Sequence, residues 1–227
     1  MVSSLILGAQ MSWILADTDD YLVVNKPAGW LTIAPSSSAN GQLGADGPAV
    51  PIVIEALREK FQRSPHVRIL PVHRLDRETS GVLLVAKTAH FHREASQWFQ
   101  SRQLKKTYEC LAVGSPRLPI LKIQSPIEGK PCLTQVEVIR KSPEKQAFFG
   151  KILLGTGRRH QIRIHLASLG YPLCGDVHYG GPREWQQMTF DRVALHAREL
   201  RFPSGERFEA PRPADFQAWV DWLGHSV

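Results

Sequence analysis

Cysteine is scarce in this chain of 227 residues, which contains only Cys110, Cys132 and Cys174. An odd number without a Cys-x-x-Cys pair argues against a disulfide framework and against a cysteine-based zinc site. We therefore expect three small buried thiols in a protein that works in the reducing cytoplasm.

Long apolar runs are also lacking. No stretch approaches the roughly 20 apolar residues that cross a bilayer as a helix, so no membrane span is predicted. The opening MVSSLILGAQ has neither a basic start nor a small-residue cleavage pattern, which argues against a secretory signal. We expect residues 1–11 to form a flexible N-terminal extension and residues 12–227 to form one domain. Within that domain, the Ser-, Gly- and Pro-rich segment 35–51 is predicted to be a mobile loop.

Acidic residues are fewer than basic ones, with 21 Asp and Glu against 28 Lys and Arg, so the formal net charge is +7. Such an excess favours a polyanionic partner, nucleic acid first, because phosphate groups attract clustered cations. The hydrophobic content of 43% and the charged content of 22% are typical of a folded globular protein.

Periodic patterns, in contrast, are plentiful. Short or alternating apolar runs predict strands, and apolar residues three to four apart predict helices. Thr88 is predicted to cap the second helix and Gly170 to end the third. Because strands and helices interleave irregularly, with hairpin-like joins, we predict an α+β fold around a mixed, mostly antiparallel sheet flanked by helices. The predicted strands are 13–16, 21–26, 81–87, 106–114, 134–141, 147–155 and 193–202, and the predicted helices are 52–61, 89–99, 158–169 and 215–223.

Two segments are unusually dense in polar side chains, and the first is HRLDRETSG at residues 73–81. It places Asp76 between Arg74 and Arg77. A surface ion pair is the plain interpretation, and such pairs contribute roughly 0–1 kcal/mol. The sharper hypothesis is a carboxylate that the guanidinium groups keep ionised and that faces an anionic ligand bound by the same arginines.

The second segment is TGRRHQIRIHL at residues 156–166, which is predicted to be helical. Residues three apart share a helix face, so His160 and Arg163 are expected to point together. The predicted buried side consists of Ile162, Leu166 and Leu169. The Thr-Gly start leaves backbone N–H groups free at the predicted helix N-terminus, which favours phosphate as a ligand.

Other chemistries have weaker support in these segments. A metal site at His160 and His165 lacks a carboxylate or cysteine at suitable spacing. A nucleophilic pair of Ser80 and His73 lacks the G-x-S-x-G context. Without a G-x-x-x-x-G-K-[ST] loop, nucleotide hydrolysis is not predicted. From pattern alone, a helix so rich in Arg and His is more often a solvated or RNA-facing surface than a catalytic one.

Taken in order, HRLDRETSG, KTYEC and TGRRHQIRIHLASLGYPLCGD resemble the RluA family of pseudouridine synthases, and the resemblance extends over almost the whole chain from about residue 13. Enzymes of this family isomerise chosen uridines in RNA by detaching uracil from the sugar and rejoining it through carbon instead of nitrogen. The resemblance implies the pseudouridine-synthase fold in a single catalytic domain. It also implies transfer or ribosomal RNA as the partner, and neither a cofactor nor a metal.

The resemblance further implies the roles of particular residues. Asp76 in HRLD matches the catalytic aspartate, Tyr108 in KTYEC the tyrosine that packs against the target base, and Arg163 in HQIR the arginine that pairs with the aspartate. Arg74 matches the arginine that helps to occupy the space left by the extruded nucleotide. Further residues expected to bind the substrate are His73, Gly157, Arg158 and His160.

Several points stay open at the level of sequence. Asp76 could attack the sugar or the base, since a carboxylate can act as a nucleophile or stabilise positive charge. We do not expect the S4-type RNA-binding domain that many relatives carry before the catalytic part, which leaves both RNA classes as candidates. A non-catalytic RNA-binding module and a glycosidase that releases free base are the competing functions. No pattern marks a subunit interface, so we expect a monomer.

Overall fold

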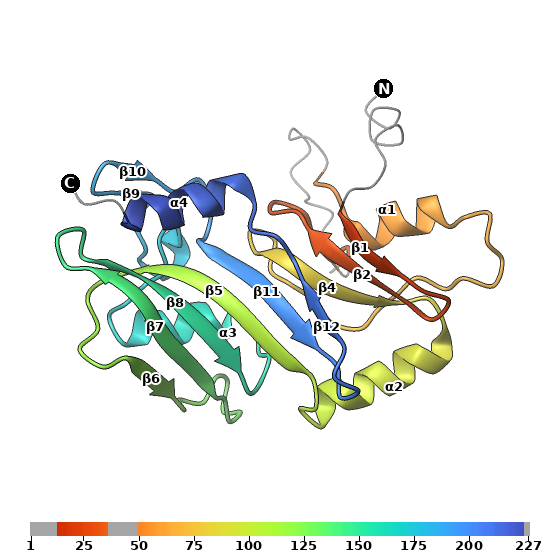
Figure 1. Cartoon of the computed structure of the whole chain (residues 1–227). Helices are drawn as coiled ribbons and strands as arrows, with labels where there is room; N and C mark the ends of the chain where they lie inside the picture. Colours follow the sequence, from red (N-terminus) through yellow and green to blue (C-terminus); the bar gives the residue numbers. More distant parts are fainter. Residues whose placement is uncertain (1–12, 36–49, 225–227) are drawn as a thin grey trace.

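The computed structural model describes residues 13–35 and 50–224 of the chain. The flexible extension predicted for residues 1–11 and most of the mobile loop predicted for residues 35–51 lie outside the described residues, so both remain predictions. The described part is built around one large, twisted sheet (Figure 1).

Ten strands form this sheet, and eight of them follow the order β1-β2-β4-β11-β5-β8-β7-β6, with β3 paired to β4 and β12 paired to β11. Strands β4 and β11 pair in parallel, whereas the other pairs in the described part of the sheet are antiparallel. The predicted α+β fold with a mixed, mostly antiparallel sheet is therefore confirmed. The strands are β1 (Ile14–Asp17), β2 (Tyr21–Lys26), β3 (Leu70–Pro71), β4 (Ser80–Ala86), β5 (Lys105–Val113), β6 (Ile120–Ile123), β7 (Thr134–Ser142), β8 (Ala147–Leu154), β11 (Leu195–Arg201) and β12 (Arg207–Glu209).

The helices cover both faces of the sheet because side chains alternate along each strand. Helices α1 (Val53–Lys60) and α3 (Gln161–Ser168) pack on the face that carries Leu83 and Cys110. Helices α2 (Ala89–Gln100) and α4 (Ala214–Gly224) cover the opposite face. In Figure 1, α3 lies behind the strands and α4 lies in front of them.

The local signals for helices are largely confirmed. The Thr88 hydroxyl accepts a hydrogen bond from the backbone N–H of Phe91 at 3.2 Å, which caps α2 as predicted. Gly170 follows the end of α3 with a left-handed φ of 78°, a conformation that glycine adopts without strain. The apolar face of α4 is buried, and it consists of Phe216, Trp219, Val220 and Leu223.

One helix boundary was predicted wrongly. Helix α3 begins at Gln161 and not at residue 158, because His160 has a left-handed backbone (φ 54°) that cannot continue a helix backwards. Residues 156–159 are therefore a loop, and Thr156 and Gly157 do not form the helix N-terminus. Leu169 is 45% exposed instead of buried, since the helix ends at Ser168 and Leu169 turns out of the core.

Several short elements were not predicted, and they include β3, β6 and β12 of the large sheet. A hairpin of β9 (Glu184–Trp185) and β10 (Met188–Thr189) stands apart from the large sheet, and a 3-10 turn, η1 (Val177–Tyr179), follows α3 in the chain. Segments of two or three residues are too short to show a period. Among the helices that the structure describes, none combines the length and the apolar character that a membrane span requires.

Candidate active site

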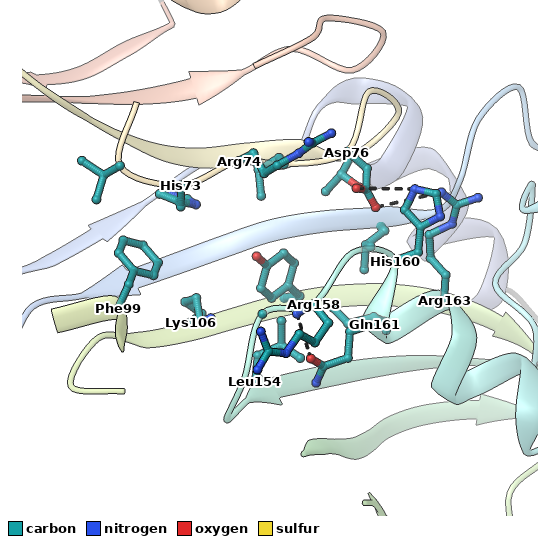
Figure 2. A pocket seen from close by; sticks show the side chains of 17 residues that line it. His73, Arg74, Asp76, Phe99, Lys106, Leu154, Arg158, His160, Gln161 and Arg163 are labelled. Atoms are coloured by element: carbon teal, nitrogen blue, oxygen red, sulfur yellow. Dashed lines mark hydrogen bonds and ion pairs between the residues drawn. The ribbon is translucent and has the colours of Figure 1, made fainter. Parts of the chain in front are cut away.

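A cavity of about 290 Å³ opens on the face of the sheet that α3 covers. Its walls come from the loop between β3 and β4, from β5, and from the loop that leads into α3. Figure 2 shows Asp76, His160 and Arg163 at one end, and His73, Phe99 and Lys106 at the other. The lining residues are Val72, His73, Arg74, Leu75, Asp76, Thr79, Phe99, Lys106, Tyr108, Leu154, Gly157, Arg158, His160, Gln161, Ile162, Arg163 and Leu195.

The Asp76 carboxylate lies near the His160 imidazole and the Arg163 guanidinium, but it forms a close hydrogen bond with neither. Its Oδ1 lies 3.7 Å from His160 Nε2, and its Oδ2 lies 3.9 Å from Arg163 Nη1 (Figure 2). Both distances exceed the usual 2.7–3.2 Å of a hydrogen bond. The side chain is 21% exposed, so its oxygens remain accessible to a ligand in the cavity.

The loop that carries Asp76 is fixed from the opposite side by the segment that follows β2. The Thr32 hydroxyl donates to the backbone carbonyl of Leu75 and accepts from its N–H, each at 3.1 Å. The ammonium of the fully buried Lys26 donates to the carbonyl of Arg77 at 3.1 Å and also to the carbonyls of Pro27 and Trp30. Asp76 is thus held between two anchored neighbours in the chain.

Arg163 takes its principal contacts from a residue that sequence reasoning gave no role, Asp176. Its Nε and Nη2 donate to the two carboxylate oxygens of Asp176 at 2.7 and 2.6 Å, which leaves Nη1 for Asp76. Burial lowers the pKa of Arg163, but the hydrogen bond and charge of Asp176, and then Asp76, outweigh it and raise the pKa overall. Arg163 therefore remains a fixed positive charge, and its guanidinium carbon lies 5.0 Å from the centre of the Tyr179 ring.

His160 is placed by its unusual backbone and by Tyr179. Its Nδ1 shares a hydrogen bond of 3.0 Å with the Tyr179 hydroxyl, which directs Nε2 towards Asp76. Burial lowers the pKa of His160, the charge of Asp76 opposes this effect, and Arg163 adds to it. The ring is consequently held as a neutral imidazole at neutral pH.

Tyr108 and Lys106 both project into the cavity from β5 because they are two residues apart on one strand. Tyr108 is only 9% exposed. Burial, and then the charge of Asp76, raise the pKa of Tyr108, so the phenol keeps its proton at neutral pH. The cavity thus contains an uncharged aromatic ring near the carboxylate.

His73 has a structural contact as well as a place in the cavity wall. Its Nε2 accepts the backbone N–H of Leu84 at 3.0 Å, where the pairing of β3 with β4 has ended. Its ring lies 4.7 Å from the ring of Phe99, centre to centre. Burial, and then Lys106, lower the pKa of His73 to about 3, so the ring is neutral.

The loop before α3 is organised by Gln161, which is buried and makes four hydrogen bonds. Its Oε1 accepts from the Thr156 hydroxyl at 2.7 Å and from the N–H of Arg158 at 3.1 Å, and its Nε2 donates to Leu133 and Thr134. The predicted anion site at a Thr-Gly helix start is therefore wrong in its geometry, because Gln161 already occupies the N–H of Arg158. The Arg158 side chain itself is exposed and lines the cavity.

Comparison with known proteins decides the family. The sequence model of the family described as RNA pseudouridylate synthase matches residues 20–168. The chain belongs to the RNA pseudouridylate synthase family. The proteins of this family are isomerases that act on RNA, and the predicted resemblance is confirmed at this level.

Relatives of this synthase are similar over most of their length. The uncharacterized RNA pseudouridine synthase YhcT of Bacillus subtilis is 33% identical over 90% of this chain and 70% of its own length. The ribosomal large subunit pseudouridine synthase D of Vibrio parahaemolyticus is 32% identical over 92% of this chain and 70% of its own length. Among solved structures, the human RNA pseudouridylate synthase domain containing 1 superposes with a TM-score of 0.68 at 26% identity, covering 92% of this chain and 86% of the human one.

In this synthase the structure brings together every site residue that the sequence nominated. All eight line the one cavity, and they are Asp76, Tyr108, Arg163, His73, Arg74, Gly157, Arg158 and His160. Sequence reasoning missed Lys106, Gln161 and Asp176. The alternation of β5 could have revealed Lys106, since it shares a face with Tyr108. Phe99, on α2, is half-buried and lines the cavity.

The alternatives for the histidines and Ser80 find no support in this geometry. Ser80 hydrogen-bonds His196 at 2.9 Å, not His73, and both partners are buried. His165 is buried between the Thr134 hydroxyl and the Ser125 carbonyl, at 2.9 and 3.0 Å. In the ranges 13–35 and 50–224, no three His, Cys, Asp or Glu side chains are grouped so that they could hold a metal ion.

Proposed function

We propose that this synthase converts specific uridines of transfer or ribosomal RNA to pseudouridine, and that Asp76 is the catalytic residue. The observation that carries the proposal is the Asp76 carboxylate itself, which faces a cavity and is flanked by Arg163 and His160 without a tight hydrogen bond to either. The cytoplasmic location and the monomeric state that the sequence favours remain part of this proposal.

The reaction needs a group that assists breakage of the bond between C1′ of the ribose and N1 of uracil. A carboxylate can do so as a nucleophile or by stabilising positive charge on the sugar. Arg163, whose position is fixed by Asp176, would place a positive charge beside the Asp76 carboxylate. One carbon–nitrogen bond is replaced by one carbon–carbon bond within the same nucleotide, so the overall change requires no redox cofactor.

The cavity suits a single base turned out of its helix. Its volume of about 290 Å³ is near the lower end of ligand pockets, roughly 300 Å³. Flipping a nucleotide out costs a few kcal/mol, and stacking on an aromatic ring contributes roughly 1–3 kcal/mol. Tyr108 would provide that ring, and the buried Ile162 and Leu195 would provide apolar walls.

Exposed basic residues at the rim would contact the RNA backbone. Arg74 and Arg158 are exposed, line the cavity, and have no carboxylate of the described chain within ion-pair distance. Contacts of this kind position RNA and make its affinity depend on salt. Ribosomal RNA is the first substrate to test, because one relative is named for the ribosomal large subunit.

Replacing Asp76 by Asn tests the proposed catalytic role. We expect Asp76→Asn to abolish pseudouridine formation in unmodified transcripts of transfer RNA and large-subunit ribosomal RNA, while RNA binding and thermal unfolding stay close to wild type. The matched control is Asp19→Asn, which changes an exposed carboxylate in the turn between β1 and β2. Pseudouridine is mapped by its selective chemical labelling.

Three outcomes would contradict the proposal. Full activity in Asp76→Asn would remove Asp76 from the chemistry. Binding without any pseudouridine, even by the wild type on total cellular RNA, would indicate a non-catalytic RNA-binding module. Free uracil among the products would indicate a glycosidase.

A further inference from the structure

Lys106 stands where two cavities meet. The first is the Asp76 cavity, and the second, of about 390 Å³, extends from it along the end of α2. The two cavities share five lining residues, which are Phe99, Lys106, Leu154, Gly157 and Arg158. A ligand that fills the Asp76 cavity therefore has a continuous path past Lys106 into the second.

The ammonium of Lys106 is poorly satisfied by the protein. Its one hydrogen bond, to the Thr156 carbonyl, is long at 3.4 Å, and the ammonium lies 5.6 Å from the centre of the Phe99 ring. Two buried lysines elsewhere in the described structure differ, since Lys87 pairs with Asp17 at 2.8 Å and Lys26 donates to three carbonyls. An ammonium carries three donors, so Lys106 keeps two for a ligand.

The second cavity has the charge expected of an anion site. Arg102, Lys106 and Arg158 line it, and no Asp or Glu does. Gly157 forms part of the shared wall, and a Cβ added there would lie 3.1 Å from Lys106 Nζ, so a side chain at this position would crowd the ammonium. Because burying an uncompensated charge is costly, a partner of opposite charge is the natural complement.

We propose that Lys106, with Arg102 and Arg158, forms a subsite for a backbone phosphate of the RNA strand next to the target uridine. This inference rests on the proposed function, because the subsite would guide the RNA strand out of the Asp76 cavity on one side of the target uridine. A uracil carbonyl would satisfy one donor of Lys106 but would leave the three positive charges uncompensated. A phosphodiester supplies the negative charge and acceptor oxygens together.

The test measures RNA binding separately from catalysis. Lys106→Gln is made in the Asp76→Asn background, and its affinity for unmodified transfer and large-subunit ribosomal RNA transcripts is measured over a series of NaCl concentrations. We expect a three- to tenfold weaker affinity and a salt slope that is smaller by about 0.7–0.9, the value for one phosphate contact. The matched control is Lys105→Gln, which removes an exposed lysine on the other face of β5 and should change neither quantity as much.

The pH dependence provides a second readout. Burial lowers the pKa of Lys106 to about 8, so affinity should weaken above about pH 8 in the Asp76→Asn protein and stay level in its Lys106→Arg derivative. Among the groups that face Lys106, His73 is already neutral and burial raises the pKa of Tyr108, while the guanidinium groups of Arg102 and Arg158 line the same cavity.

Two results would overturn the subsite. An unchanged salt slope with weaker affinity would assign Lys106 to a neutral group such as a uracil carbonyl. Equal losses in the Lys105 and Lys106 variants would indicate only a general effect of net charge. Failure of the proposed function is distinguishable, because it would appear as missing pseudouridine with the wild-type protein, whereas these binding measurements use a protein that needs no activity.

Discussion

Arg163 divides its guanidinium unequally between two carboxylates. The contact with Asp176 is bidentate and buried, whereas the contact with Asp76 is 3.9 Å long through one nitrogen. The unequal division has a physical consequence. Asp176 fixes the position and the plane of the guanidinium, so Asp76 lies beside a positive charge without being held in a tight ion pair.

Replacing Asp176 by Asn should therefore damage catalysis more than binding. The amide loses the charge that holds Arg163, and the guanidinium is free to close onto Asp76. We expect kcat to fall at least tenfold, with KM within about threefold of wild type, and the melting temperature to fall because a buried ion pair is broken. Steady-state kinetics and thermal unfolding measure these effects.

The matched control for that variant is Asp215→Asn. Asp215 also forms a bidentate pair, with Arg192 at 2.7 and 3.1 Å, but it belongs to α4. The Asp215→Asn variant should unfold at a lower temperature than the wild type, while its kcat stays unchanged. If both variants lowered kcat equally, a loss of folding, and not the position of Arg163, would explain the effect.

At the level of elements, the parallel contact between β4 and β11 depends on Gly81. Its φ is 116°, and a Cβ added there would lie 2.1 Å from the backbone carbonyl oxygen of Ala197 on β11. Backbone cannot move aside as a flexible side chain can. Gly81 is the second residue of β4, so the close approach of these two strands also sets where the Asp76 loop ends.

Gly81→Ala should consequently destabilise the fold by about 3 kcal/mol or more, since it combines a backbone clash with an unfavourable φ. Urea unfolding gives this value. The control is Gly205→Ala, where φ is 100° but no atom lies within 4 Å of the added Cβ. It should cost only about 1 kcal/mol. If both variants lost a similar free energy of unfolding, the positive φ alone would explain the loss, and β4 and β11 would not be in tight contact at Gly81.

The sequence predicts those elements whose period or caps are local. Seven strands and the Thr88 cap could be found in this way, because each depends on residues close in the chain. The start of α3 could not, since the left-handed His160 is stabilised by Tyr179, nineteen residues away. Asp176 was also missed because its interaction is not local. Its partner Arg163 lies on another element, and nothing in the spacing signals the pair.

On the scale of the whole molecule, the sheet brings distant segments of the chain into one site. Asp76 precedes β4, Tyr108 lies on β5, and Arg163 lies on the helix after β8. These segments meet because β11 inserts between β4 and β5, and β8 pairs with β5 (Figure 1). The order of strands in a sheet cannot be predicted from local sequence patterns, although the motif resemblance pointed to the same three residues.

The same packing buries several histidines in their neutral form. Burial is the first cause that lowers the pKa of each of them, and it brings the pKa of His196 to about 4. His196 is fully buried, where its ring hydrogen-bonds Ser80 at 2.9 Å and the Ala210 carbonyl at 3.2 Å. The histidines with a lowered pKa are His73, His160, His165 and His196.

Stability should therefore fall in mild acid. Below the unfolded pKa of about 6.5, the unfolded chain binds protons that the folded histidines do not yet accept, so the free energy of unfolding decreases as the pH falls. His196 alone accounts for about 2 kcal/mol between pH 6.5 and 5. Urea unfolding at these two pH values should show at least this loss in the wild type and in His90→Gln, which replaces an exposed histidine. The loss should be about 2 kcal/mol smaller in His196→Gln, and a wild-type stability that stayed constant over this range would show that the buried imidazoles accept protons without cost.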